Sequence, residues 1–373
     1  MDERQHRIVF AGGGTGGHLF PALAVADELR QRPDVSIEFV GARRGVEARL
    51  VPEAGYPLRL LRLSGLKGRG AIGRIGAIVA AILAVCRCLG WWLSSRPDLV
   101  IGVGGYASGP AVLAARILRV RTMVMEQNHY PGATNRALAP RVDRVCVPSE
   151  AALRRLSGRC VVTGNPVRAE FLAIGDPPGD KRLSLLVFGG SRGARSINRA
   201  MMDALPRLAR MEPAPKIVHQ CGVDDAPEVE TAYRGYPGPA EVRPFLPDMP
   251  ERLAVADLVV CRAGASTLSE LAAAGRPAIL VPYPHAADDH QRHNAEAVQE
   301  TGAAIVILDR ELNGERLADG VSRLGGDPER RRAMARAART LAMPDAARKI
   351  AGVALELLGR ETVNGGESVN DVS

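Results

Sequence analysis

Apolar and polar residues follow two alternating patterns along the chain. Short apolar runs rich in Val, Ile and Leu are separated by longer stretches in which apolar residues recur every three or four positions, and several of the short runs end in glycine. Strands separated by crossover helices in this way are typical of parallel α/β sheets. The expected strands cover residues 8–11, 36–40, 99–103, 122–125, 185–188, 216–220, 258–261 and 278–281.

The same pattern occurs twice. The triplet Asp-Leu-Val at 98–100 returns at 257–259, and at the same offset Gly105 is matched by Gly264. A chain of 373 residues is also too long for one ordinary domain. We therefore expect two Rossmann-like parallel-sheet domains that face a ligand cleft.

Prolines and glycines between the two halves break regular structure and mark the domain boundary. The first domain is expected over residues 1–164 and the second over 165–341. A helical pattern rich in Ala and Arg ends the second half and is interrupted at Pro344. This break predicts that a helix over 342–359 crosses back to complete the first domain. Residues 360–373 are expected to be a polar tail.

Composition narrows the partners and the compartment. Forty-nine basic against 41 acidic residues give a formal charge of +8, which favours a phosphate ester, a nucleic acid or an acidic membrane surface as partner. The six cysteines include no C-x-x-C pair, so a reducing cytoplasm is expected. The amino end lacks the pattern of a secretion signal. The most lipid-like segment, 75–86, is shorter than the ~20 residues of a spanning helix, so no transmembrane segment is predicted.

The first glycine-rich loop reads Gly-Gly-Gly-Thr-Gly-Gly-His over residues 12–18, ahead of a helix expected to open at Pro21. Glycines allow tight turning, and a helix N-terminus presents N–H groups to an anion, so phosphate or pyrophosphate is the expected guest. The loop also matches the G-x-G-x-x-G dinucleotide fingerprint, which keeps an NAD(P) enzyme as an alternative. The second expected strand is followed by Arg43 and Arg44 rather than an acid, which suits at most a 2′-phosphate.

Three further loops have the same character. The second, 102–110, follows a strand of the same half, so it should lie beside the first at the carboxyl edge of the sheet. The third, 189–194, and the fourth, 263–270, follow strands of the second half. In the fourth loop, Glu270 has two possible roles. Its carboxylate could accept hydrogen bonds from two neighbouring ribose hydroxyls, or it could be a first-turn acid favoured by the helix dipole.

Six motifs taken together resemble the MurG family of N-acetylglucosaminyltransferases, which make the final lipid-linked intermediate of peptidoglycan. The motifs occur in the same order as in the family, and they span most of the length of this chain. The motifs are GGTGGH at 13–18, GGY at 104–106, EQN at 126–128, GNPVR at 164–168, GGS at 189–191 and CRAGA at 261–265.

The resemblance implies a GT-B fold whose second domain binds UDP-N-acetylglucosamine and whose first binds an undecaprenyl-pyrophosphate-linked acceptor. It implies inverting transfer to the C4 hydroxyl of N-acetylmuramyl-(pentapeptide)-pyrophosphoryl-undecaprenol. No cofactor and no nucleic acid partner are expected, and because no Asp-x-Asp pair is suitably placed for a cation, metal is not expected to be an obligatory ligand. The residues it implies for donor binding are Thr15, Gly16, Gly17, Asn128, Arg168, Ser191, Leu246 (uracil, through its backbone), Ala265, Ser266, Thr267, Leu268, Ser269, Glu270 (ribose) and Gln291. Those it implies for the acceptor diphosphate are Gly14, His18, Gly104, Gly105 and Tyr106.

Inverting transfer needs a base for the acceptor hydroxyl and charge stabilisation for the departing UDP. Helix N-termini and the Ser191 hydroxyl can stabilise the leaving diphosphate. His18 is the candidate base because an imidazole titrates near neutral pH, although a loop histidine can also be only a hydrogen-bonding partner. Glu126 is the other candidate, and its alternative role is a strand-end carboxylate bonded to nearby backbone.

Apolar residues recur at helical spacing over 71–93, with basic residues nearby and Trp91 and Trp92 at one end. Such a segment suits shallow docking on anionic lipid, but a buried domain-packing helix would show the same stripe. The expected membrane contacts are Ile75, Ile78, Val79, Ile82, Lys67, Arg69 and Arg74. With a lipid-linked acceptor, docking predicts a peripheral enzyme at the cytoplasmic face of the plasma membrane.

Three alternatives stay open. The chain could be a glycosyltransferase with a soluble acceptor, a UDP-N-acetylglucosamine 2-epimerase, or a non-enzymatic nucleotide-sugar-binding regulator. The basic amphipathic segment argues against the first two, and the glycine loops of the first half would have no purpose in the third. Other proteins of cell-wall synthesis and division are expected as further partners.

Overall fold

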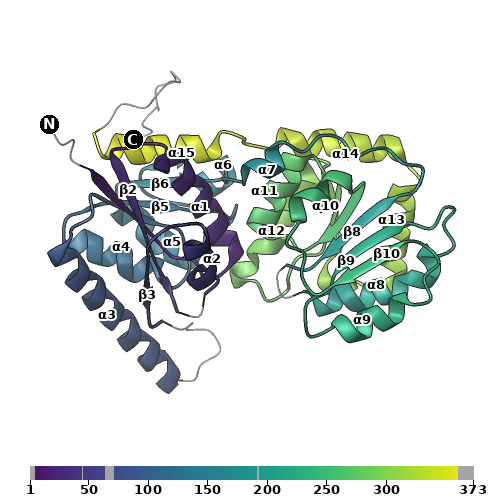
Figure 1. Ribbon diagram of the computed structural model, residues 1–373, viewed down its shortest axis with the longest axis horizontal. Helices are drawn as coiled ribbons and strands as arrows, with labels where there is room; N and C mark the ends of the chain where they lie inside the picture. Colours follow the sequence, from purple (N-terminus) through teal and green to yellow (C-terminus); the bar gives the residue numbers. More distant parts are fainter. Residues whose placement is uncertain (1–4, 44, 64–70, 191–192, 360–373) are drawn as a thin grey trace. The chain divides into compact units, whose positions relative to one another are not determined.

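The computed structural model describes residues 5–43, 45–63, 71–190 and 193–359. The chain divides into two compact units, one made of Met1–Arg168 with Met343–Ser373 and the other of Ala169–Ala342. Each unit is built around one parallel sheet with helices on both faces (Figure 1). This architecture confirms the expected fold of two parallel-sheet α/β domains.

Unit one contains a seven-stranded sheet in the order β3-β2-β1-β4-β5-β6-β7, with every pairing parallel. Its strands are β1 (His6–Ala11), β2 (Val35–Ala42), β3 (Leu58–Leu61), β4 (Leu99–Gly102), β5 (Arg121–Met125), β6 (Arg144–Val147) and β7 (Cys160–Val162). Its helices are α1 (Gly16–Arg30), α2 (Glu47–Glu53), α3 (Ala71–Ser94), α4 (Ser108–Ile117), α5 (Ala133–Leu138), η1 (Ala139–Arg141), α6 (Glu150–Leu153) and α15 (Ala346–Leu357).

Strand β1 shows why both faces of this sheet are covered. Ile8 and Phe10 point into a core shared with α1 and α15, whereas Val9 and Ala11 point into a second core shared with α3 and α4. All four side chains are fully buried. A strand buried on both faces reads as a continuous apolar run, which is how the sequence presented it. The carboxyl-terminal helix α15 thereby belongs to the core of unit one.

Helix α3 covers the helical pattern expected over 71–93 and has two different apolar faces. It spans 24 residues, and its stretch Gly76–Ser94 is long and apolar enough to cross a membrane by length and composition alone. The earlier expectation of a segment too short to span is therefore wrong. Ala84, Cys88 and Trp92 pack into the core of unit one. Trp92 is 1% exposed, so it is a core residue and not the interfacial tryptophan that the sequence suggested.

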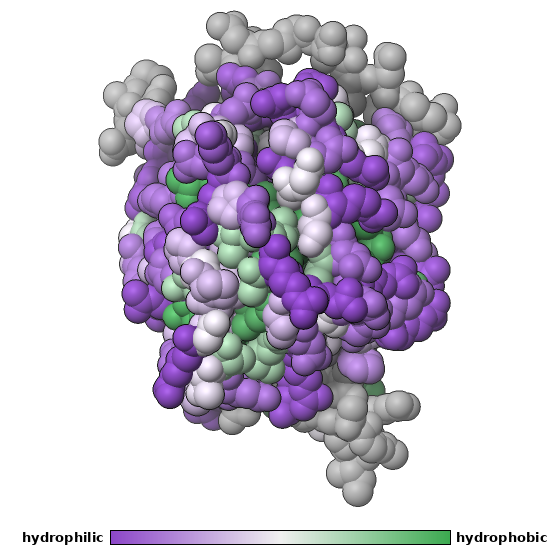
Figure 2. Space-filling view, turned by 90° about the vertical axis from the view of Figure 1, so that its right-hand side faces the viewer, coloured by the Kyte–Doolittle hydropathy of each residue, from purple (hydrophilic) through white to green (hydrophobic). Residues whose placement is uncertain are grey.

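The opposite face of α3 carries exposed apolar side chains. The exposed fractions are 55% for Ile78, 49% for Val79, 57% for Ile82 and 63% for Leu83. By contrast, the face of the molecule in Figure 2 is largely hydrophilic, with hydrophobic residues only in small groups. A stripe of large exposed apolar residues is unusual on a protein surface and marks an interaction site. The stripe of Ile78, Val79 and Ile82 is therefore not explained by packing inside its own domain.

Unit two contains a six-stranded parallel sheet in the order β10-β9-β8-β11-β12-β13. Its strands are β8 (Ser184–Phe188), β9 (Lys216–Gln220), β10 (Ala240–Arg243), β11 (Leu258–Cys261), β12 (Ala278–Leu280) and β13 (Ala304–Val306). Its helices are α7 (Ala169–Leu172), α8 (Arg195–Leu208), α9 (Ala226–Tyr233), α10 (Met249–Val255), α11 (Ala265–Ala274), η2 (Ala287–Asp289), α12 (His290–Glu300), η3 (Asp309–Glu311), α13 (Gly314–Gly325) and α14 (Pro328–Thr340).

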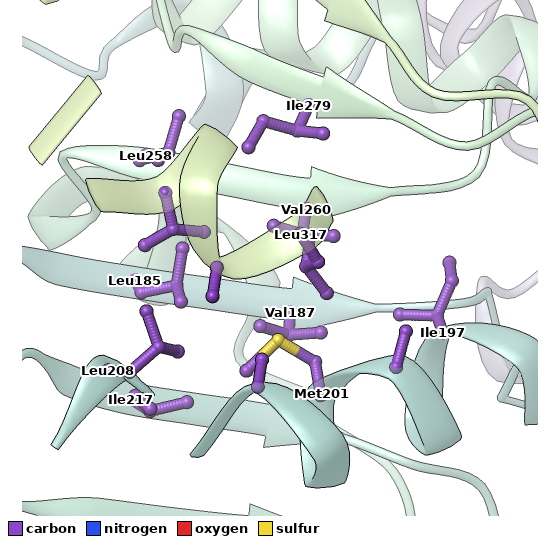
Figure 3. Packing of buried hydrophobic residues seen from close by; sticks show 14 of the residues in the cluster. Leu185, Val187, Ile197, Met201, Leu208, Ile217, Leu258, Val260, Ile279 and Leu317 are labelled. Atoms are coloured by element: carbon purple, nitrogen blue, oxygen red, sulfur yellow. The ribbon is translucent and has the colours of Figure 1, made fainter. Parts of the chain in front are cut away.

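The core of unit two packs α8 and α13 against the central strands (Figure 3). Ile197, Met201 and Leu208 lie along one face of α8. Met201 lies beside Val187 of β8, Leu208 lies beside Ile217 of β9, and Leu317 of α13 enters the same core. These side chains are fully buried. Such regular spacing on an otherwise polar helix is what fixes α8 against the sheet.

Both sheets reverse their strand order at one point. In unit one the reversal lies between β1 and β4, and in unit two it lies between β8 and β11. Ligands of open parallel sheets bind at the carboxyl ends of strands at such reversals. The loops that leave these four strands are the four glycine-rich loops found in the sequence.

Candidate active site

The first two glycine loops interlock at the carboxyl edge of the unit-one sheet. The Gly13 N–H donates to the Gly104 carbonyl at 3.1 Å. A Cβ on Gly12 would lie 2.1 Å from the Gly104 oxygen, and one on Gly105 would lie 2.2 Å from the Gly13 oxygen. No side chain fits at either place, and both glycines have positive φ. The expectation that the two loops are neighbours is confirmed.

His18 lies against the second loop. A Cβ on Gly104 would lie 2.6 Å from the His18 ring carbon Cδ2, so the ring covers that glycine. The Nδ1 atom of His18 is 3.2 Å from the Thr15 hydroxyl oxygen, which orients the ring. Tyr106 in the same loop is 55% exposed. Of the acceptor-side residues predicted from the sequence, the structure thus brings His18 against Gly104 and brings Gly105 against Gly13 of the first loop.

Helix α1 begins earlier than expected. It starts at Gly16 with Thr15 as its N-cap, and Pro21 lies inside the helix rather than opening it. Gly16 and Gly17 therefore belong to the first turn, where N–H groups have no partner inside the helix and can face an anion. The guanidinium of Arg168 lies 5.1 Å from the ring centroid of Phe20, which places this predicted donor residue beside α1.

Gly14 differs from its predicted role. Its N–H donates to the Glu47 carboxylate at 2.7 Å, so this N–H faces a protein acceptor rather than a ligand. A contact between Gly14 and the acceptor diphosphate would have to use the shape of the loop instead of this donor. Nothing in the sequence pattern linked Glu47 to the loop.

Glu126 is saturated with hydrogen bonds. It is 3% exposed and accepts from five described N–H groups. They are the backbone N–H groups of Gln127, Asn128 and Gly132 and the side-chain amides of Asn128 and Asn135. A carboxylate engaged in this way is poorly placed to take a proton from a substrate. The geometry favours a positioning role, in which Glu126 orients the predicted donor-binding residue Asn128.

In unit two, the fourth loop delivers the N-terminus of α11. Gly264 is the N-cap, and Ala265, Ser266 and Thr267 are partly exposed while Leu268 is buried. The Ser269 hydroxyl donates to the Ala265 carbonyl at 3.0 Å. Glu270 is the sixth helical residue, so its explanation as a first-turn acid favoured by the helix dipole is wrong.

An ion-pair network behind these loops was missed by the sequence reading. The Arg262 guanidinium donates to Asp309 and, at 2.8 Å, to the Ser196 hydroxyl, which itself donates to Asp309 at 2.6 Å. Arg262 also donates to the carbonyls of Val281 and Pro282. It therefore ties the end of β11 to the start of α8 and to the segment after β12. The motif CRAGA at 261–265 is visible in the sequence, but nothing in the sequence pattern predicts that its arginine pairs with Asp309.

Two other predicted donor residues have defined places. Leu246 follows β10 and is 3% exposed. The Gln291 side-chain oxygen accepts the Tyr283 N–H at 3.0 Å, which binds α12 to the segment after β12. The Gln220 amide donates to the Gly190 carbonyl at 2.7 Å and so supports the third loop from β9.

A buried histidine lies in the same strand as Gln220. His219 is fully buried, with Nε2 3.0 Å from the Asn198 side-chain oxygen and Nδ1 3.0 Å from the Tyr233 hydroxyl. The Asn198 amide donates to Asp225 and Cys221, so its oxygen accepts from Nε2–H and the Tyr233 hydroxyl donates to Nδ1. Burial lowers the pKa of His219 from 6.5 to about 3.

This depressed pKa predicts acid sensitivity. Below pH 6.5 the unfolded state binds a proton at His219, whereas the folded state does not until about pH 3. The free energy of unfolding therefore has its full value above pH 6.5 and decreases as the pH falls below it. Between pH 7 and pH 5 the loss is about 2 kcal/mol. Urea unfolding followed by circular dichroism should show a correspondingly smaller pH dependence for His219→Gln. An equal pH dependence in both proteins would contradict the assignment.

Comparison with known proteins identifies the family. Residues 8–147 match the glycosyltransferase family 28 N-terminal domain, and residues 184–350 match the C-terminal domain of that family. A protein of Anaeromyxobacter sp. (strain Fw109-5) is 46% identical over 361 residues, which cover 95% of this chain and 94% of the relative. It is named UDP-N-acetylglucosamine--N-acetylmuramyl-(pentapeptide) pyrophosphoryl-undecaprenol N-acetylglucosamine transferase.

The crystal structure of Acinetobacter baumannii MurG aligns with a TM-score of 0.78 and 31% identity, covering 94% of this chain and 99% of that one. This chain belongs to the MurG family. The GT-B fold implied by the sequence resemblance is therefore shown. A crystal structure of UDP-N-acetylglucosamine 2-epimerase also aligns, with a TM-score of 0.69 over 97% of this chain and 100% of that one. At 14% identity, that likeness extends to the fold alone.

Some predicted MurG-family site residues lie outside the described residues. They are Ser191 in the third loop and Lys67 and Arg69 ahead of α3, and the side chains of Arg74 and Ile75 are likewise outside the description. Among the residues that the structure does describe, no group of three or more His, Cys, Asp or Glu side chains could hold a metal ion. Metal independence remains a prediction.

Proposed function

We propose that this chain transfers N-acetylglucosamine from UDP-N-acetylglucosamine to the C4 hydroxyl of N-acetylmuramyl-(pentapeptide)-pyrophosphoryl-undecaprenol, forming the β-linked disaccharide with inversion. The family membership carries this proposal, since relatives with that printed name are 44–46% identical over most of the chain. The glycine loops at both strand-order reversals agree with a reaction whose donor and acceptor each contain a diphosphate.

On the acceptor side, we propose His18 as the base. The acceptor oxygen attacks C1 of the donor sugar, its proton passes to the imidazole, and the bond from C1 to the diphosphate oxygen breaks. Thr15 orients the His18 ring, and the α1 start at Gly16 and Gly17 offers N–H groups to a diphosphate. Glu126 is the weaker candidate because its carboxylate already accepts five N–H groups.

On the donor side, we propose that the N-terminus of α11 binds the UDP diphosphate. The small residues Ala265, Ser266 and Thr267 leave its N–H groups approachable, and a helix N-terminus stabilises the negative charge that grows on departing UDP. Glu270 would accept from the ribose hydroxyls, and Arg262 would hold the surrounding loops in place through Asp309. This arrangement requires no metal ion for charge stabilisation.

We further propose that the chain docks peripherally on the cytoplasmic face of the plasma membrane through the exposed stripe of α3. Large apolar side chains at Ile78, Val79, Ile82 and Leu83 are exposed, and an amphipathic helix of this kind lies in the interface with its apolar face in lipid. The opposite face is anchored in the protein core through Trp92. That anchoring supports docking rather than spanning.

The α3 stripe can be tested with vesicles. Replacing Ile78 and Ile82 by Asn should weaken partitioning to phosphatidylglycerol-containing vesicles about tenfold or more, because apolar burial in lipid is lost. A Val223→Asn variant is the matched control, since Val223 is 75% exposed in unit two. Cosedimentation with the vesicles measures the partitioning of both variants.

Charge reversal at Lys67, Arg69 and Arg74 should reduce vesicle binding further at low salt. Unchanged partitioning of the α3 variant would contradict membrane docking through this face.

Incubation of the protein with donor alone separates the alternatives. A transferase leaves UDP-N-acetylglucosamine largely intact until acceptor is added and then releases UDP. A 2-epimerase forms the C2 epimer of the donor without any acceptor, and a regulator that only binds the nucleotide sugar changes nothing in either case. Chromatography of the nucleotide products distinguishes the three outcomes.

A further inference from the structure

Glu47 is a fully buried carboxylate next to the first glycine loop. It lies in the first turn of α2 and is 1% exposed. Its Oε2 accepts the Gly14 N–H at 2.7 Å, and its Oε1 accepts the Ala42 N–H at 2.8 Å. One carboxylate therefore joins the loop after β1 to the end of β2.

Three glycines make room for this carboxylate. A Cβ on Gly13 would lie 2.7 Å from Oε2, one on Gly41 would lie 2.4 Å from Cγ, and one on Gly45 would lie 2.0 Å from Oε2. Only Gly13 of these has a positive φ. Gly41 and Gly45 are thus explained by the space that Glu47 occupies rather than by backbone conformation.

The consequence for the loop is that its first three N–H groups face protein acceptors. Gly12 donates to the Val40 carbonyl at 2.9 Å, Gly13 to the Gly104 carbonyl at 3.1 Å, and Gly14 to Glu47. The chain is held in this turn until Thr15, where α1 begins. The position of the α1 N-terminus, and of His18 in its first turn, is therefore set by these three anchors.

We propose that Glu47 is a positioning residue for the transfer reaction, which presets the first glycine loop and through it His18 and the α1 N-terminus. The inference rests on the proposed function for the reaction it serves. Of the three anchors, Glu47 is the one supplied by a side chain, so it is the one that substitution can remove. Misplacing a catalytic group by about 1 Å can lower the rate about 100-fold.

Glu47→Gln is the sharpest variant. A carboxamide has one acceptor oxygen and one NH₂ group, but both partners of Glu47 are N–H donors, so in either orientation one N–H meets a donor. We expect kcat/KM for the lipid-linked acceptor to fall about 10- to 100-fold. The Kd for UDP, measured by calorimetry, should change less than about twofold, because the contacts proposed for its uracil, ribose and diphosphate (Leu246, Glu270 and the N-terminus of α11) lie in unit two.

Asp143→Asn is the matched control. Asp143 accepts the Thr122 N–H at 2.7 Å in the same unit, but Thr122 lies at the start of β5, at the sheet edge away from the loops. The control should lower the melting temperature and keep kcat/KM. If both variants lose stability and both keep kcat/KM within about twofold, Glu47 is only structural and the proposal is overturned.

Glu47→Asp and hydrogen exchange keep the test decisive if the glutamine variant does not fold. The shorter aspartate cannot reach both N–H groups without a shift of α2, so amides of residues 12–19 should exchange faster while those of 195–208 are unchanged. Unchanged exchange in a folded Glu47 variant overturns the proposal whether or not the enzyme is active. A wild-type protein that makes no product would instead refute the proposed function, while the exchange result still decides the role of Glu47.

Discussion

Replacing His18 by Gln is expected to lower kcat about 10²- to 10⁴-fold while leaving the KM for UDP-N-acetylglucosamine within about threefold. The reason is that the imidazole at the second glycine loop is proposed to remove the proton of the acceptor hydroxyl, whereas the contacts proposed for the uracil, the ribose and the diphosphate of UDP lie in unit two. Initial-rate measurements at saturating acceptor give both constants.

The matched control for this variant is His6→Gln. His6 begins β1, and the loop that carries His18 leaves the other end of that strand, so His6 is a histidine of the same unit at the opposite sheet edge. It should retain full activity. The competing base is tested with Glu126→Gln. A His18 variant that keeps its rate beside a Glu126 variant that loses it about 1000-fold would transfer the role of base to Glu126.

Replacing Glu270 by Ala should raise the donor KM about 10- to 100-fold, because the carboxylate is proposed to accept charge-assisted hydrogen bonds from the ribose. Its position in the second turn of α11 leaves no helix-dipole role that the substitution would also remove. Glu251→Ala, an exposed first-turn acid of α10, is the control and should change the donor KM little.

A donor that lacks the ribose 2′-hydroxyl makes this test specific. Wild-type enzyme should discriminate between UDP-N-acetylglucosamine and its 2′-deoxy analogue, and the Glu270→Ala enzyme should discriminate much less, since the partner of that hydroxyl is gone. Equal discrimination by the two enzymes would show that Glu270 does not contact the ribose.

Several strands could be predicted from the sequence because they are short, largely buried runs with many β-branched residues. Residues 216–220 and 258–261 were delimited without error as β9 and β11. Strand β10 was missed because its four residues are partly or fully exposed and two of them are charged. Strands β7 and β13 were missed because each has three residues that are mostly only partly buried, whereas β12 is as short but fully buried.

The glycine loops could also be predicted, since each follows an apolar run. The side chains that hold these loops in place could not be predicted. Glu47 is one acid in a short helix, 33 residues from Gly14, and only the fold brings the two together. Arg262 and Asp309 are likewise 47 residues apart. Trp92 was misassigned for a different reason. An apolar helix face that ends in tryptophan has the same sequence pattern whether it packs on lipid or on the protein core.

The most direct test of the proposed function is transfer of radiolabelled N-acetylglucosamine from UDP-N-acetylglucosamine to a short-chain analogue of N-acetylmuramyl-(pentapeptide)-pyrophosphoryl-undecaprenol, with a chelator present. The proposal predicts acceptor-dependent labelling of the lipid-linked product with release of UDP, undiminished by the chelator. Folded protein that binds UDP but labels no lipid-linked acceptor, with or without added magnesium, would contradict it.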